Sequence, residues 1–218
     1  MKTIYNLIFF QTVDELLINL HSASQMRAMK TIPSASLILH VDATGSLVTV
    51  NNSNSIKYKR IMNYAIIAKN AKELDKRGLL VNETITSGND TFSLEQMFGK
   101  FRQSYYKLYN TDKMFSSLVC DMSWATVHAS LHVFNREDIH QYAERVFQLA
   151  KDNNHETSSD KIYTASCNSH LMKRYCYQVK KNCKFASVEI KRFAICSFTL
   201  LANCRDLNSF DSILQLII

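Results

Sequence analysis

Two short apolar runs, each followed directly by an aspartate, constrain the fold of this chain more than any other feature. Residues 37–41 lead into Asp42 and then into Ala-Thr-Gly-Ser, and residues 115–120 lead into Asp121. Short apolar runs bounded by turn residues are typical of buried strands. We therefore expect each aspartate at the exit of a strand. The alternative is that each only caps a helix, with Asp121 capping a helix that opens at Met122.

Two carboxylates at strand exits predict a site for a divalent cation. Hard cations such as Mg²⁺ and Mn²⁺ take oxygen ligands, and two carboxylates offset the charge of metal and phosphate. We expect Asp42 and Asp121 to be both the metal ligands and the catalytic residues of phosphoryl transfer. The sequence has neither a Gly-rich dinucleotide motif nor a Walker motif, which argues against dinucleotide and P-loop chemistry.

The remaining pattern predicts an α/β fold with a mixed sheet. The expected order is a helix, three sequential strands, a helix, the strand before Asp121, and then mostly helices. Three sequential strands can form an antiparallel meander, and a helical crossover then makes the next strand parallel to the first. This is the architecture of the ribonuclease-H-like fold. The expected helices cover residues 12–30, 93–109 (with Ser93 as the cap), 123–134, 136–151, 170–181, 185–204 and 208–218, and the expected strands cover 36–42, 58–69, 79–86 and 161–166.

The positive charge of the chain is concentrated near its C-terminal end. Residues 161–192 hold eight basic residues and one acid, so this segment alone accounts for the net charge of +7. Such clustering favours a polyanion such as DNA, although a solvated helix face is the alternative. The predicted nucleic-acid-binding residues are Lys173, Arg174, Lys180, Lys181, Lys184, Lys191 and Arg192. A second basic cluster comprises Lys57, Lys59, Arg60, Lys69, Lys72, Lys76 and Arg77.

These motifs together resemble the transposase core of Mutator-like DNA transposons, and more closely the transposase-derived proteins of invertebrate genomes. The resemblance rests on Leu-His-Val-Asp42-Ala-Thr-Gly-Ser, Val-Cys-Asp121-Met-Ser-Trp-Ala and Cys167-Asn-Ser-His170. It implies a ribonuclease-H-like domain with three acids, of which Asp42 and Asp121 match the first two. Cys167 and His170 match the family's Cys-x-x-His element near the active site.

The sequence departs from that family at the third acid, a glutamate that follows a long helical insertion. Glu189 is a poor match, and Asp206 and Asp211 are no better placed. We therefore expect a chain truncated before the third acid. The expected domains are an N-terminal helical lead-in (1–35), a ribonuclease-H-like core (36–170) and the start of a helical insertion (171–218).

The cysteine, histidine and aromatic residues of interest can be interpreted as functional or as purely structural. Cys167 and His170 have zinc-like spacing, but no second pair completes four ligands, so zinc is not expected. Trp124 is expected in the core or as a lid over the site. Tyr105, Tyr106 and Tyr109 lie near basic residues and could stack on bases, or pack on the sheet instead.

Two classes of function remain open. The first is an enzyme fragment for metal-dependent DNA strand cleavage and transfer, with weak Mg²⁺ or Mn²⁺ binding and little activity alone. The second is a non-catalytic remnant that binds DNA or a protein partner. The expected partners are DNA, and a full-length transposase or a second copy of this chain. No run approaches the length of a membrane span, so no membrane association is expected. The six cysteines lack the framework spacing of a small secreted scaffold, which favours a reducing compartment, and we expect an intracellular protein, nuclear or cytoplasmic.

Overall fold

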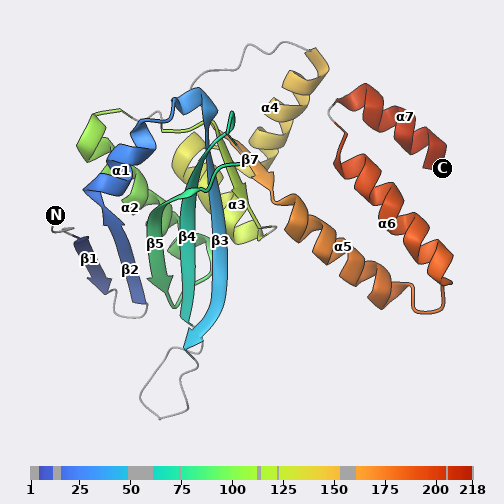
Figure 1. The fold of residues 1–218 in the computed structure, drawn as a ribbon, viewed down its shortest axis with the longest axis horizontal. Coiled ribbons are helices and arrows are strands. Elements are labelled where there is room, and N and C mark those ends of the chain that lie inside the picture. The colour runs from blue at the N-terminus through green and yellow to red at the C-terminus, as the bar shows by residue number, and fades with distance from the viewer. Residues whose placement is uncertain are drawn as a thin grey trace. The chain divides into compact units, whose positions relative to one another are not determined.

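The computed structural model describes residues 5–11, 16–48, 61–73, 75–111, 114–121, 123–152, 161–204 and 206–217. The chain divides into two compact units, which are described separately. The first unit comprises residues 1–139 with 160–165, and the second comprises residues 140–159 with 166–218. The chain is therefore an α/β protein whose sheet lies in the first unit and whose second unit is helical (Figure 1).

The first unit is built on a seven-stranded sheet with the order β1-β2-β5-β4-β3-β6-β7. Strands β1, β2, β5, β4 and β3 pair antiparallel with their neighbours, whereas β6 pairs parallel to β3. The strands are β1 (Tyr5–Gln11), β2 (Leu16–Ser22), β3 (Leu37–Val48), β4 (Ile61–Asn70), β5 (Leu79–Thr86), β6 (Ser117–Cys120) and β7 (Tyr163–Ser166). The mixed sheet predicted from the sequence is thus present, with the meander and the parallel crossover strand both confirmed.

Helices of the first unit pack on one face of this sheet. Helix α1 (Ala23–Lys30) and helix α2 (Thr91–Tyr109) contact β2 and β5, and α3 (Trp124–Ser130) packs against α2 (Figure 1). A 3₁₀ turn, η1 (Ser34–Ser36), precedes β3, and a π-helical turn, η2 (Leu131–Asn135), continues α3.

The hydrophobic core lies between these helices and the sheet. Met26 of α1, Leu39 of β3, Ile66 of β4 and Phe98 of α2 are all fully buried. Burying each such side chain contributes about 1.5–3 kcal/mol before entropy is counted. This core fixes the positions of β3 and β6, which carry the two predicted acids.

The helix predicted over residues 12–30 is wrong in its first half. Leu16–Ser22 is strand β2, and only Ala23–Lys30 is helical. A capping box at Ser22 starts the helix, because the Ser22 hydroxyl accepts from the Gln25 amide while the Gln25 side chain accepts from Ser22 N–H at 2.7 Å. The helical lead-in expected over 1–35 is therefore also wrong, since β1 and β2 extend the sheet.

Other predicted elements agree with the structure to within a few residues. The strand over 79–86 is confirmed as β5, and the strand over 58–69 is found as β4, with 51–60 outside the described residues. Helix α2 is capped by Asp90 rather than by Ser93, because the Asp90 carboxylate accepts from Ser93 N–H at 2.8 Å. The short strand expected over 161–166 is β7.

The second unit consists of α4 (Ile139–Asp152), α5 (Asn168–Asn182), α6 (Val188–Ala202) and α7 (Leu207–Ile217). Helix α5 packs on α6 and α6 packs on α7. Tyr175 of α5 stacks on Phe198 of α6 with ring centroids 3.9 Å apart. The helical character predicted for this part of the chain is confirmed, but the compact unit also includes residues 140–159, which the predicted boundary at residue 170 left in the core.

Candidate metal site at the edge of the central strands

Strands β3 and β6 bring the two predicted acids to the same end of adjacent strands. Their parallel register pairs Ile38 with Ser117 and ends with Val41 opposite Cys120. The next residue along each strand is an aspartate, Asp42 on β3 and Asp121 after β6. The predicted adjacency of the two strand positions is therefore confirmed. Whether the carboxylates share a cation stays a prediction.

The sequence predicted Asp42 at the exit of its strand, and this is wrong, because Asp42 lies within the strand. Strand β3 continues to Val48, and Asp42 is paired with Ala65 of β4. The small residues after Asp42 form no turn because β4 offers them hydrogen-bonding partners as far as Thr44, which pairs with Asn63. Only the pairing with β6 stops at Val41, so Asp42 is the first residue of β3 beyond that ladder.

The two carboxylates are held in different surroundings. Asp42 is exposed, and its Oδ1 accepts a hydrogen bond from Ala43 N–H at 2.9 Å. Asp121 is half-buried, and its Oδ1 accepts from Ser123 N–H at 3.3 Å. Ser123, not Asp121, is the N-cap of α3. One oxygen of each carboxylate is thus engaged by a backbone amide, and no hydrogen bond from the described residues engages the other.

A buried tyrosine shows that this edge of the sheet is electronegative. The pKa of Tyr64 on β4 is raised to about 12, by burial first and then by the charges of Asp121 and Asp90. Asp90 follows β5, which runs in the same direction as β3 because both are antiparallel to β4. Asp90 and Asp121 therefore follow the C-terminal ends of β5 and β6, and Asp42 lies in β3 just beyond its pairing with β6. Such an edge attracts cations.

Sequence reasoning missed Tyr64 and Asp90 as neighbours of the site. Asp90 is the N-cap residue of α2, and this geometry explains its local role. The signal that could have found it is topological, since the third strand of a meander ends at the same edge as the first. No group of three His, Cys, Asp or Glu side chains suited to a metal ion occurs among the residues that the structure describes.

The acids weighed as third ligands lie in the second unit, and two of them, Glu189 and Asp206, make hydrogen bonds at helix N-termini. Glu189 lies in the first turn of α6, and its pKa is lowered by a backbone hydrogen bond and then by Ser187. Asp206 accepts from Ser209 N–H at 2.7 Å at the start of α7. Asp211 is exposed on α7. These contacts explain the carboxylates without a metal.

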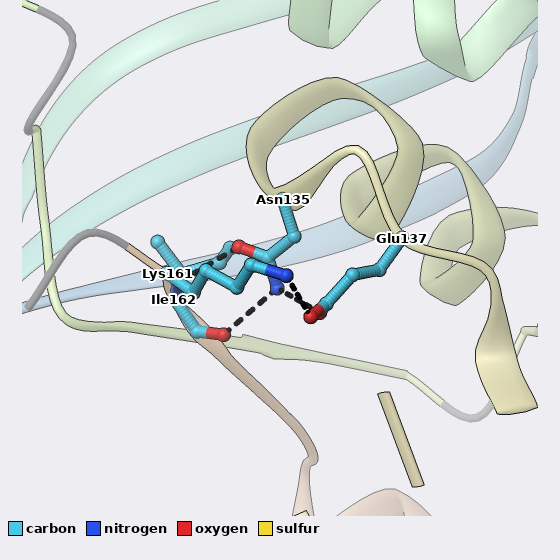
Figure 2. A network of polar contacts seen from close by, with 4 residues as sticks. All are labelled: Asn135, Glu137, Lys161 and Ile162. Carbon is cyan, nitrogen blue, oxygen red and sulfur yellow. Dashed lines mark hydrogen bonds and ion pairs between the residues drawn. The ribbon is translucent and has the colours of Figure 1, made fainter. Parts of the chain in front are cut away.

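Glu137 is a buried carboxylate that the sequence did not single out. It is 4% exposed and forms an ion pair with Lys161. Asn135 donates to Glu137 at 3.2 Å and to the Ile162 carbonyl at 3.0 Å, while Ile162 N–H donates back to Asn135 at 2.8 Å (Figure 2). This network, the Asn135 clasp, joins both sides of the chain segment that contains α4.

The Asn135 clasp lies at the other end of β6 from Asp121. Tyr163, next to Ile162, donates to Ser116 at the start of β6 at 2.9 Å. Strand β6 has four residues, so its two ends are separated by about 13 Å at roughly 3.3 Å per residue. Glu137 is therefore a structural carboxylate and not a third ligand beside Asp121.

Cys167 and His170 lie in the second unit, at the start of α5. Cys167 is the N-cap residue of that helix without a side-chain capping bond, and both side chains are half-buried. No disulfide joins any cysteine to another among the described residues. A position of Cys167 and His170 near Asp42 and Asp121 stays a prediction.

The predicted DNA-binding residues lie on α5, on α6 and in the turn between them. All of them are exposed except Lys191, which is half-buried; they are Lys173, Arg174, Lys180, Lys181, Lys184, Lys191 and Arg192. In the other basic cluster, Lys72, Lys76 and Arg77 are exposed between β4 and β5, and Lys76 pairs with Glu73 at 2.6 Å. Lys57, Lys59 and Arg60 lie outside the described residues.

Aromatic residues near the site differ from expectation. Trp124 is not in the core, because it is 67% exposed. Tyr105 is buried against the sheet side of α2, whereas Tyr106 is 46% exposed. Of the three tyrosines considered for base stacking, Tyr106 is thus the most accessible.

Comparison of the sequence with models of known protein families finds no match, and comparison with curated proteins finds no related sequence. Within the described part of the chain, no helix has both the length and the apolar character needed to cross a bilayer.

Proposed function

We propose that this chain is part of the catalytic domain of a DNA transposase, built on a ribonuclease-H-like sheet and specialised for metal-dependent strand cleavage and transfer. The observation that carries the proposal is the parallel pairing of Val41 with Cys120, which puts Asp42 and Asp121 next to each other along the sheet edge. The resemblance of both acid motifs to Mutator-like transposases supports the same assignment.

The strand order supports the ribonuclease-H-like part of this proposal. The strands β5-β4-β3 form an antiparallel meander, and β6 lies beside β3 in parallel. This is the arrangement expected when a helical crossover, here α2, follows three sequential strands. Strands β1 and β2 extend the meander at its free edge.

In the proposed mechanism, Asp42 and Asp121 would hold Mg²⁺ or Mn²⁺ through their free oxygens. The cation would supply Lewis-acid stabilisation of a phosphodiester oxygen. Asp42 is exposed and so open to substrate. Asp121 is half-buried beside Tyr64 and Asp90, whose carboxylate adds negative potential that attracts the cation.

The chain alone should have little or no nuclease activity. Among the described residues no three His, Cys, Asp or Glu side chains are grouped so that they could hold a metal ion, and aligned positioning of metal and nucleophile supplies much of the rate of such enzymes. We therefore expect weak cation binding without efficient turnover.

Isothermal titration with Mn²⁺, combined with a plasmid-nicking assay, tests this proposal. The parent should bind Mn²⁺ weakly, Asp42→Asn and Asp121→Asn should each abolish that binding, and Asp211→Asn should not change it. Unchanged binding in both site variants would refute the metal site. Robust nicking that both variants abolish would instead show that the chain is a complete enzyme and that a third ligand exists.

A second candidate is a DNA-binding or protein-interaction remnant without catalysis. The exposed basic residues of α5 and α6 favour it, because they carry the excess charge of the chain. Charge reversal of Lys180, Lys181 and Lys184 should then weaken duplex DNA binding, and the affinity of the parent should fall steeply with salt. Binding that ignores both changes would exclude this surface.

A further inference from the structure

A groove runs along the outer side of α2 where the helix meets η2. Two neighbouring hollows of about 290 and 460 Å³ share Gly99 and Gln103 as lining residues. We call their joined surface the Gly99 groove. It is lined by a row of α2 residues at helical spacing, which are Phe92, Gln96, Gly99, Gln103 and Tyr106. At 1.5 Å per residue, this row extends over about 21 Å.

Gly99 makes the centre of this groove open. It lies in the interior of α2, where glycine is unfavourable relative to alanine. A Cβ built at Gly99 would meet no described atom within 4 Å, so packing inside the protein does not require glycine there. A missing side chain on a concave surface allows close approach of a ligand.

Two short contacts fix the second wall of the groove. His132 of η2 pairs with Glu95 of α2 at 2.6 Å, and the Arg102 guanidinium donates to the Val133 carbonyl at 2.6 Å. The wall therefore belongs to a π-helical turn held rigidly on α2. Such turns are rare and occur frequently at functional sites.

A row of rings leads from the Asp121 end of α3 to this groove. Trp124, His128 and His132 follow one another at intervals of four residues, with successive ring centroids 6.1 Å apart. Trp124 is 67% exposed. Arg136, the C-cap residue after η2, lines the same hollow as His132, and its φ of 55° makes it one of two left-handed non-glycine residues in the described chain.

The chemistry of this surface fits single-stranded nucleic acid. Exposed rings at Phe92, Tyr106 and Trp124 offer stacking platforms, while the exposed Arg136 offers positive charge for phosphates. Sites for single strands combine such rings with basic grooves. Glutamine side chains along the row can donate to and accept from base edges.

We propose that the Gly99 groove, together with the row of rings from Trp124 to His132, binds a single strand of nucleic acid. The bases stack on the exposed rings, and the backbone passes Gly99 and Arg136. This assignment does not depend on the metal site, because none of its residues is an expected metal ligand. It is also distinct from the basic surface of α5 and α6.

Trp124 is the only tryptophan of the chain, so its fluorescence reports binding directly. Titration of the full chain with oligodeoxythymidine should quench this fluorescence, and the anisotropy of a labelled oligonucleotide should rise over the same concentrations. Gly99→Leu, which fills the groove, and Arg136→Asn, which keeps a residue tolerant of the left-handed conformation, should each weaken binding about tenfold or more. Trp124→Leu should weaken the anisotropy-detected binding as well.

Matched controls separate this surface from the rest of the chain. Phe185→Leu removes a fully exposed ring of the second unit, and Lys72→Asn removes an exposed charge from the β4–β5 turn. Both should leave affinity for the single strand unchanged. Binding without quenching of Trp124, or full affinity in Gly99→Leu and Arg136→Asn that remain folded by circular dichroism, would overturn the proposal. A change in oligomeric state of Gly99→Leu without loss of binding would assign the groove to protein contacts and also overturn it.

Discussion

The carboxylate of Asp121 and the phenol of Tyr64 interact electrostatically across the edge of the central strands. Burial and this charge, with a further contribution from Asp90, raise the pKa of Tyr64 to about 12. The interaction joins β4 to the loop after β6, although the two strands are separated by β3 in the sheet. The raised pKa of Tyr64 is therefore a property of this site that can be measured without any metal.

Tyr64 should make the chain less stable in alkali. Because the pKa of Tyr64 is raised in the folded state from 10 to about 12, the unfolded chain loses the phenolic proton first. The free energy of unfolding should therefore fall as the pH rises from 10 towards 12. Tyr64→Phe should reduce this slope in urea unfolding measured by circular dichroism, and Tyr177→Phe, at an exposed position, should not. Equal slopes in Tyr64→Phe and the parent would contradict the assignment.

His21 should make the chain less stable in acid. Burial lowers the pKa of His21 below 6.5, against the smaller opposing effect of its hydrogen bond with Asn82. Below pH 6.5 the unfolded chain takes up a proton that the folded chain resists, so the free energy of unfolding should fall. His21→Gln should flatten this acid limb, whereas His140→Gln, at an exposed position on α4, should leave it as steep as in the parent. His40, whose pKa is lowered by burial and by Lys69, should contribute in the same direction.

The Asn135 clasp should be a strong determinant of stability. Asn135→Ala would leave the buried N–H and C=O of Ile162 without their side-chain partner. At roughly 0.5–1.5 kcal/mol for each of these two lost hydrogen bonds, the variant should lose about 1–3 kcal/mol. Asn182→Ala, which removes an exposed hydrogen bond to Gln178, should change stability by less than about 0.5 kcal/mol. Similar midpoints for the two variants in urea would show that the clasp does not hold the fold.

Replacement of Gly99 and of Gly78 by alanine should change the stability of the chain in opposite directions. Gly99→Ala should stabilise the chain by about 0.5–1 kcal/mol, because the methyl group meets no described atom and α2 gains a better helix former. Gly78→Ala should destabilise it by about 1–3 kcal/mol, because the new Cβ would lie 2.3 Å from Cγ2 of Ile67. Thermal unfolding of both variants measures this contrast. A destabilised Gly99→Ala would mean that the groove is closed in solution.

Sequence patterns predicted those parts of the fold in which the apolar residues follow a single period, either that of a strand or that of a helix. Strand β5 alternates along its length, and α2 presents a single buried stripe that includes Leu94, Phe98 and Phe101, so both were found. The segment Leu16–Ser22 was not recognised as a strand, because its apolar residues fit a helix as well as a strand. Pairing of Asn19 with Thr84 of β5, a contact between distant residues, decides in favour of the strand.

The candidate site was predictable where local motifs and strand topology define it, and not where it depends on contacts between distant residues. The positions of Asp42 and Asp121 followed from two similar local motifs and one topological rule. The continuation of β3 past Asp42 was not predictable, since it depends on β4 as a partner. Glu137 and Lys161 form a pair across 24 residues without any local pattern, and the exposure of Trp124 depends on how α3 packs on α2.

The central claim is that Asp42 and Asp121 together hold one divalent cation, and paramagnetic broadening by Mn²⁺ tests it most directly. In ¹H–¹⁵N spectra of the full chain, substoichiometric Mn²⁺ should selectively broaden the amides of Ala43, Asp121 and Ser123. Broadening at these amides should disappear in Asp42→Asn and in Asp121→Asn but persist in Asp211→Asn. Broadening that is uniform over the chain, or that survives both site substitutions, would contradict the account.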